Sequence, residues 1–168
     1  AIANDATYGW DVTRHQNDRR GTWSQVRATL VKSARFPDPD QDQGQHQWNF
    51  RIVPDASVLE AVAAGQQINL GVREVSGAPV DAPFSVDGAV VESVALAPDR
   101  SGDLVIRLYE AEGGPSRVTF RAPKAGSVTA CDLRYRPSES EPELRGGQGE
   151  WSFDLSAFQI TTLRVSFA

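Results

Sequence analysis

The residues "PDPDQDQGQH", from Pro37 to His46, carry the densest set of side chains with chemical potential in the chain. They include three aspartates and a histidine, and no aliphatic residue. Carboxylates accept paired hydrogen bonds from sugar hydroxyls or from arginine, and with imidazole they also bind metal ions. The segment lies between "VRATLVKS" and "WNFRIVP", which both have the composition of strands. A hairpin turns in about two to five residues, so a longer polar loop indicates a second role.

Metal binding is one such role, and the sequence limits it. The chain has two histidines, His15 and His46, and one cysteine, which are too few for a zinc site of these residue types alone. A mixed site would use Asp42, His46 and another carboxylate. A calcium site would use Asp38, Asp40 and Asp42, although the glycine and glutamate of an EF-hand loop are misplaced. A solvated acidic loop is the more frequent outcome for such a segment.

Other catalytic arrangements have weaker support. No G-x-S-x-G motif fixes a serine nucleophile. Paired carboxylates would suit a glycosidase, but spacing does not show which ones would face each other. The segments "EGGPS" and "RGGQG" lack the lysine of a phosphate-binding loop and are interpreted as turns.

The four tryptophans are the residues that could stack on sugar rings. Trp48 and Trp151 lie in alternating segments, which predicts core positions for both. Trp10 and Trp23 flank the polar hairpin "DVTRHQNDRRGT" and are the candidates for exposed platforms.

Composition excludes several classes of function. The net charge is −5 and no basic stripe exists, which argues against nucleic-acid binding. No apolar run is long enough to cross a bilayer, and no secretory signal opens the chain. The single cysteine, Cys131, fits a reducing compartment, so we expect a cytoplasmic protein; within "VTACDLRY" it is expected to be a buried structural thiol. The sequence has no methionine, which is expected of a processed chain or a piece of a larger protein.

The elements that must position these residues are mostly strands. Alternation with period two predicts strands in "VRATLV", "LVIRLYEA", "RVTFRA", "EWSFDLS" and "TLRVSF". Leu104, Ile106 and Leu108 are expected in the core. The other residues expected on the half-buried face of these strands are Val26, Ala28, Leu30, Val118, Phe120, Trp151, Phe153, Leu155, Leu163, Val165 and Phe167. One helix is expected at about residues 56–64, with Asp55 as N-cap and Gly65 at its end. Loops are expected at 76–83 and 136–149, and Arg107 and Glu110 are expected to pair on a sheet surface.

These patterns predict a single all-β domain over residues 1–168, an antiparallel β-sandwich with one short helix. A closed barrel is the alternative architecture.

Four stretches in order along the chain carry a family resemblance. They are "NDATYGWDV" at 4–12, "PDPDQDQGQH" with the following "QWNFRIVP", "SGDLVIRLYEAEGGPSRVTF" at 101–120, and "AFQITTLRVSF" at 157–167. Together they resemble the C-terminal β region of bacterial α-mannosidases of glycoside hydrolase family 38. The departures are small: Ala157 and Gln159 replace a usual proline and glutamate, and Lys32 and Ala34 stand where arginine and proline are common.

The resemblance implies a galactose mutarotase-like super-sandwich and a non-catalytic role. In the family, a catalytic barrel precedes this region and carries an aspartate nucleophile and the ligands of a catalytic zinc. No stretch of this sequence resembles those motifs. The resemblance therefore implies the C-terminal domain of a zinc-dependent retaining α-mannosidase, inactive alone and without a cofactor of its own. Its expected partners are its own catalytic domain and an α-mannoside oligosaccharide.

The polar loop gains a role from the resemblance, since loops of this region reach the rim of the catalytic cleft in the family. We expect Asp38, Asp42 and His46, with Asp5 and Tyr8 from the opening motif, to form or support the face turned to the catalytic domain or the substrate. A second interpretation is that Asp38 and Asp42 cap backbone amides of the loop and bind His46. The two interpretations are compatible with each other. A stand-alone carbohydrate-binding module is the alternative function.

Overall fold

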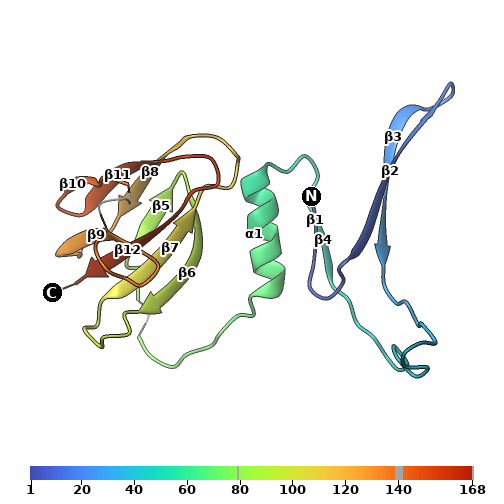
Figure 1. Cartoon of the computed structure of the whole chain (residues 1–168), viewed down its shortest axis with the longest axis horizontal. Helices are drawn as coiled ribbons and strands as arrows, with labels where there is room; N and C mark the ends of the chain where they lie inside the picture. Colours follow the sequence, from blue (N-terminus) through green and yellow to red (C-terminus); the bar gives the residue numbers. More distant parts are fainter. Residues whose placement is uncertain (79, 139–141, 168) are drawn as a thin grey trace. The chain divides into compact units, whose positions relative to one another are not determined.

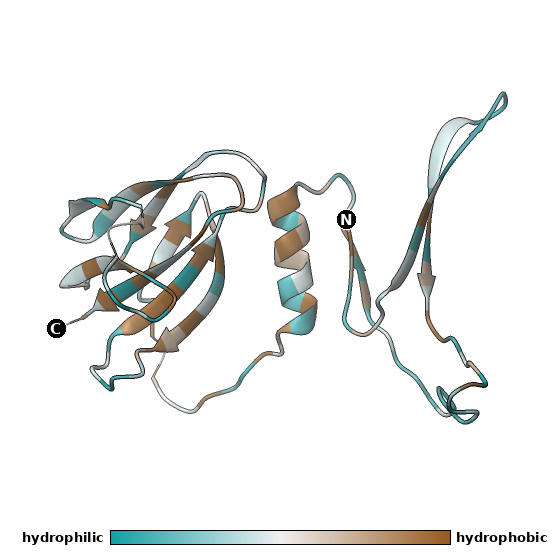
Figure 2. Ribbon diagram, viewed as in Figure 1, coloured by the Kyte–Doolittle hydropathy of each residue, from teal (hydrophilic) through white to brown (hydrophobic). Residues whose placement is uncertain are grey.

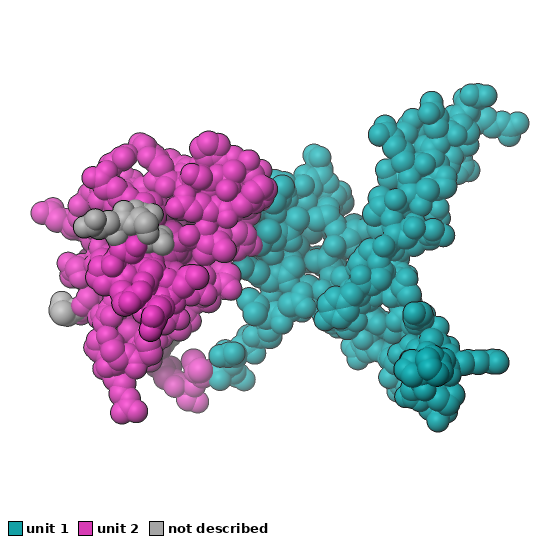
Figure 3. Space-filling view, viewed as in Figure 1, with its two compact units in different colours: residues 1–74 teal, residues 75–168 magenta. Residues whose placement is uncertain are grey.

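The chain divides into two compact units, residues 1–74 and 75–168, shown in Figure 3. The computed structural model describes residues 1–78, 80–138 and 142–167. The described residues form antiparallel sheets and one helix, which confirms the predicted fold class (Figure 1). The expectation of one domain over residues 1–168 stays a prediction, and each unit is described by itself.

The first unit contains two small sheets. Strand β1 (Ile2–Asn4) pairs antiparallel with β4 (Phe50–Ile52). Strands β2 (Gly9–Asn17) and β3 (Gly21–Thr29) form a long hairpin, in continuous register from Gly9 opposite Thr29 to Asn17 opposite Gly21. Only Thr7 and Ala64 are buried in residues 1–74. This unit therefore has no extended hydrophobic core.

The polar segment 37–46 is not a hairpin loop. Strand β3 pairs with β2 and strand β4 pairs with β1, so the segment connects two different sheets. The expectation that the flanking strands are partners was wrong, because "VRATLV" already has its partner in the preceding strand. The length of the connection follows from this crossing between sheets.

The helix α1 spans Val58–Asn69 and is longer than predicted. Ser57, and not Asp55, is its N-cap: the Glu60 amide donates to Ser57 Oγ (3.2 Å), and the Ser57 amide donates to the Glu60 carboxylate (2.8 Å). Gly65 does not end the helix, because one glycine costs only about 1 kcal/mol and the following glutamines favour helix. No helix among the described residues is long and apolar enough to cross a membrane.

The second unit is the sandwich. One sheet has the order β10-β11-β8-β5 and the other β6-β7-β12-β9, with antiparallel neighbours throughout. The strands are β5 (Ser85–Asp87), β6 (Val90–Leu96), β7 (Leu104–Tyr109), β8 (Ser116–Arg121), β9 (Ser127–Cys131), β10 (Arg145–Gly147), β11 (Glu150–Leu155) and β12 (Ile160–Ser166). Strand β10 lies in the predicted loop 136–149. It is the short segment "RGG", which has no strand pattern of its own and is a strand through its antiparallel pairing with β11.

The core lies between these two sheets. Its buried residues are Ile106, Leu108, Val118, Phe120, Ala122, Trp151, Phe153, Leu155, Leu163 and Val165. Leu104 and Phe167, also predicted, are partly buried against it. The alternation of period two thus selected the inward face of each strand of the sandwich. It did not do so in the first unit, where Val26 and Leu30 are exposed at 45% and 49%. Cys131 is buried at 1% exposure, as predicted.

Candidate functional site

The aspartates of segment 37–46 hold the backbone of their own loop. Asp42 Oδ2 accepts hydrogen bonds from the amides of Lys32 (3.3 Å) and Ser33 (2.9 Å). Asp38 Oδ1 accepts from the amide of Asp40 (2.9 Å). These contacts confirm that Asp38 and Asp42 cap loop amides, as aspartate does in turns.

His46 is fixed from two sides in the same loop. Its Nε2 donates to the carbonyl oxygen of Asp42 at 2.8 Å. Its ring stacks on Trp48, with ring centroids 5.3 Å apart and planes inclined by 19°. Trp48 is half-buried and precedes β4, so its predicted core position was wrong: its ring packs on His46 instead. Asp42 and His46 therefore form one local unit.

The opening motif ties β1 to the segment before β4. Asp5 accepts from the Asn49 amide (3.0 Å) and from Asn49 Nδ2 (2.6 Å). The bond from the Asn49 amide, followed by that from its side chain, lowers the pKa of Asp5 below 3.8. Asp5 is thus a carboxylate with a structural partner, Asn49, which directly follows Trp48 in the sequence.

Tyr8 stands apart from these contacts. It is 94% exposed. Asp5 and Tyr8 form no hydrogen bond with Asp38, Asp42 or His46 within the described part of the chain. The structure joins Asp42 to His46 and leaves Asp5, Tyr8 and Asp38 as separate features of the first unit. The role of the five residues at a cleft or interface stays a prediction.

Metal coordination has no support in this geometry. No group of three or more His, Cys, Asp or Glu side chains capable of holding a metal occurs among residues 1–78, 80–138 and 142–167. Asp38 and Asp42 turn their carboxylates to different amides, and Asp40 accepts from Gln43 Nε2 at 3.1 Å. The calcium alternative therefore lacks a set of converging oxygens.

Glu110 is the carboxylate that sequence reasoning missed. Its side chain is buried at 3% exposure and accepts from the amides of Glu112 (2.6 Å), Gly113 (2.9 Å) and Phe158 (2.9 Å). The bond from the Phe158 amide is the main cause that lowers its pKa below 4.5. The glycine pair that follows Glu110 was the available signal, because it marks a tight turn with free amides.

The predicted surface pair of Arg107 and Glu110 is therefore wrong. Arg107 Nη1 lies 3.9 Å from the carboxylate of Glu92 on the neighbouring strand. Glu110 binds backbone amides of two turns and serves the fold.

A second charged cluster fixes the β6–β7 turn to β12. Arg164 donates from Nε to Asp103 (2.6 Å) and from Nη2 to Asp99 (2.7 Å) and to Ser101 Oγ (3.0 Å). Hydrogen bonds from Ser101 and from Arg164 lower the pKa of Asp99 to about 2. Both carboxylates are ionised partners of one guanidinium, and neither is placed as a proton donor.

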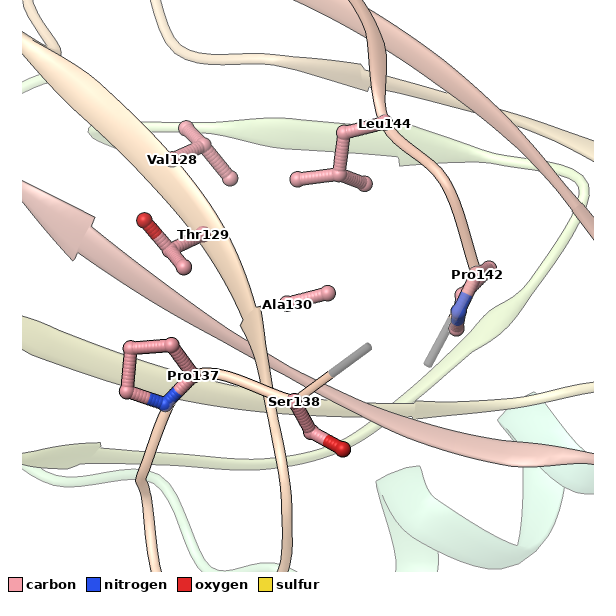
Figure 4. A pocket seen from close by; sticks show the side chains of 7 residues that line it. All are labelled: Val128, Thr129, Ala130, Pro137, Ser138, Pro142 and Leu144. Carbon is pink, nitrogen blue, oxygen red and sulfur yellow. The ribbon is translucent and has the colours of Figure 1, made fainter. Parts of the chain in front are cut away.

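A hollow of about 450 Å³ beside β9 is another candidate for a site (Figure 4). Its lining residues are Val128, Thr129, Ala130, Pro137, Ser138, Pro142 and Leu144. None of these is charged or a histidine. Among the lining residues that the structure describes, none has a side chain suited to acid–base catalysis.

The second unit is thus an antiparallel β-sandwich whose described charged groups support turns and strands. Residues 88–163 match the family model described as "Glycosyl hydrolases family 38 C-terminal beta sandwich domain". This match confirms the resemblance to glycoside hydrolase family 38. No match was found among curated proteins. All five predicted site residues precede the matched segment.

Proposed function

We propose that this chain is the non-catalytic C-terminal part of a zinc-dependent retaining α-mannosidase, and that it packs on the catalytic domain and helps to shape its cleft. The observation that carries this proposal is the family match over residues 88–163. A family 38 C-terminal domain implies a catalytic domain as partner and a glycan as substrate. We extend this to α-mannosidic bonds in oligosaccharides and to a cytoplasmic enzyme.

The carboxylates of this chain support a non-catalytic role. Retaining glycosidases need two carboxylic groups that face each other across a bond, about 5 to 5.5 Å apart. Asp5, Asp38, Asp42 and Glu110 are engaged with backbone amides. We place the zinc of the proposed enzyme in its catalytic domain, as the resemblance to family 38 implies.

The first unit supports packing on another domain. Large apolar side chains are exposed over much of it, including Phe36 at 86% and Ile52 at 70%. Apolar surface of this extent in a unit with two buried residues is typical of an interaction surface. We assign the loop residues Asp38, Asp42 and His46 to the rim of that interface, with Asp5 and Tyr8.

The test is complementation. This chain and a catalytic half expressed separately from the same gene are mixed, purified together and assayed on an aryl α-mannoside. We expect no activity from this chain alone and restored activity in the complex. Asp42→Ala and His46→Ala should lower the activity of the complex, whereas the matched loop variant Gln45→Ala should not. Mannosidase activity of this chain alone, or failure of the halves to associate, contradicts the proposal.

A carbohydrate-binding module is the second candidate, and Trp10 is the observation in its favour, since its side chain is 36% exposed. Trp23 is half-buried and stacks on His15, which occupies one ring face. If the chain is such a module, the isolated chain should bind mannose, and Trp10→Ala should abolish this binding. Titration with mannose followed by tryptophan fluorescence decides between the two functions.

A further inference from the structure

The hairpin of β2 and β3 has two faces of different character. Its register places Asp11 opposite Arg27, Thr13 opposite Gln25 and His15 opposite Trp23 on one face. Side chains of directly opposed residues lie on the same side of a sheet. The other face carries the alternate pairs: Trp10 with Ala28, Val12 with Val26, Arg14 with Ser24 and Gln16 with Thr22.

The first of these faces is satisfied by its own side chains. Arg27 donates to Asp11 Oδ1 through Nε (3.1 Å) and Nη2 (2.9 Å), and Thr13 Oγ1 donates to the same oxygen at 2.8 Å. His15 is bonded to Gln25 at 3.1 Å and stacks on Trp23 with centroids 5.3 Å apart. This polar face has few groups left for a partner.

The second face is apolar and uncovered near the open end of the hairpin. Val12 is 69% exposed, Val26 45% and Trp10 36%. Trp10 packs edge-on against Phe50 of β4, with centroids 6.1 Å apart, which anchors only the base of the hairpin. A two-stranded ribbon is at best marginally stable in water without a surface that covers its apolar face. We therefore expect another protein surface to cover this apolar face.

Arginines continue the apolar face toward the tip. Arg14 follows Val12 on the same face, and Arg19 and Arg20 lie in the turn, where Asn17 Oδ1 accepts from both amides (3.1 and 2.7 Å). These three arginines form no ion pair with any residue that the structure describes. Figure 2 shows the change from hydrophobic at the base to hydrophilic at the tip. Asp18 in the same turn offsets one of these arginines, so in a chain of net charge −5 the tip keeps a smaller local excess of positive charge.

We propose that this face, the hairpin stripe (Trp10, Val12, Arg14, Val26 and Ala28), docks on the catalytic domain of the same enzyme, in an apolar groove that ends at carboxylates. The proposal rests on the proposed function and deepens it. The charge pattern selects this occupant over a second copy of the chain. Arg14 is the one charged residue on the stripe face between Trp10 and Gln16 and on the residues opposite them. A second copy placed stripe against stripe would therefore offer Arg14 no carboxylate.

The experiment measures the affinity of this chain for the separately produced catalytic domain by calorimetry. Val12→Ser and Arg14→Glu should each weaken binding about tenfold or more, as expected for residues central to an interface. Val80→Ser and Arg100→Glu are the matched controls, since both residues are exposed and lie in the second unit. Each control should stay within about twofold of the unchanged chain. Binding by the unchanged chain should weaken with added salt, and less so for Arg14→Glu.

A second measurement needs no variant and covers the case of a misfolded hairpin. Hydrogen–deuterium exchange of the peptide over residues 9–29 should slow when the catalytic domain is added to the unchanged chain. Unchanged exchange there, or hairpin variants that bind as tightly as the controls, overturns the hairpin assignment while the proposed function stands. Absence of any binding overturns both. Self-association of this chain that Val12→Ser abolishes, seen by sedimentation, identifies a second copy as the occupant and overturns the proposal.

Discussion

The carboxylate of Glu110 accepts a 2.9 Å hydrogen bond from the amide of Phe158, 48 residues further along the chain. The same carboxylate binds the amides of Glu112 and Gly113, so one buried side chain joins the β7–β8 turn to the β11–β12 turn. Phe158 has a φ of 57°, a left-handed backbone that is uncommon for a residue with a side chain. The bond to Glu110 helps to hold it there.

Glu110→Gln should lower the melting temperature of the chain clearly more than Glu112→Gln, an exposed neighbour. The glutamine loses the charge and brings a donor group into a site of three donors, so at least one amide loses its acceptor. Thermal unfolding followed by circular dichroism at pH 7 makes the comparison. Equal melting temperatures for the two variants would show that the three bonds contribute nothing.

The lowered pKa of Glu110 also predicts acid sensitivity. Because the folded-state pKa lies below the usual value of 4.5, its contribution is complete above about pH 4.5 and is lost as the pH falls through the folded-state value. The unfolding free energy of the unchanged chain should therefore fall more steeply below pH 4.5 than that of Glu110→Gln. Denaturant titrations over this pH range test the slope, and parallel curves would contradict the prediction.

Asp99 predicts a second acid transition at lower pH. Its pKa is about 2 in the folded chain against a usual 3.8, so the bonds from Ser101 and Arg164 stabilise the fold above pH 3.8 and are lost toward pH 2. Asp99→Asn should flatten the dependence of stability on pH in this window. Asp81→Asn, at an exposed position, serves as control and should keep the slope. The carboxyl chemical shift of Asp99, followed by NMR, gives its titration directly.

Core packing in the sandwich predicts a large difference between two phenylalanines. Phe153 is 1% exposed in the core, and Phe153→Ala should cost about 3–5 kcal/mol of unfolding free energy. Phe158 is 70% exposed, and Phe158→Ala should change it by only about 0.5 kcal/mol. Urea unfolding of both variants measures these values. A similar loss of unfolding free energy in both variants would show that burial of the side chain does not determine its contribution to stability.

The polar loop predicts a local effect. Asp42→Ala removes the acceptor of the Lys32 and Ser33 amides, so these amides should exchange with solvent faster. Exchange in the strands of the second unit should not change. Gln45→Ala, which removes a neighbouring exposed side chain, gives the baseline. Faster exchange throughout the chain in Asp42→Ala would show that the loop supports more than its own backbone.

Local patterns predicted the sandwich well. Val118, Phe120, Phe153 and Leu155 alternate with polar residues, and such alternation places one set of side chains toward a core. Which strands pair with each other was harder to predict from the sequence. Residues on each side of 37–46 looked like one hairpin, because strand composition does not encode which strand lies alongside.

The charged residues were predicted least well. Arg107 and Glu110 are three residues apart, a spacing that directs their side chains to opposite faces of a strand. The Glu110 carboxylate accepts hydrogen bonds from amides of the neighbouring turn and of a segment near residue 158. A contact across 48 residues has no local signature. The Asp38 and Asp42 caps were predictable, since aspartate in a polar loop binds nearby amides by its own short reach.

Because Cys131 is buried, chemical labelling of its thiol reports how often the sandwich opens. It is the only thiol of the chain and is 1% exposed on β9, between β12 and the bridge to Pro137. A thiol reagent can modify it only after this part of the sheet separates. With excess reagent, the labelling rate measures how fast this part of the second unit opens. The first unit has no thiol and adds no signal.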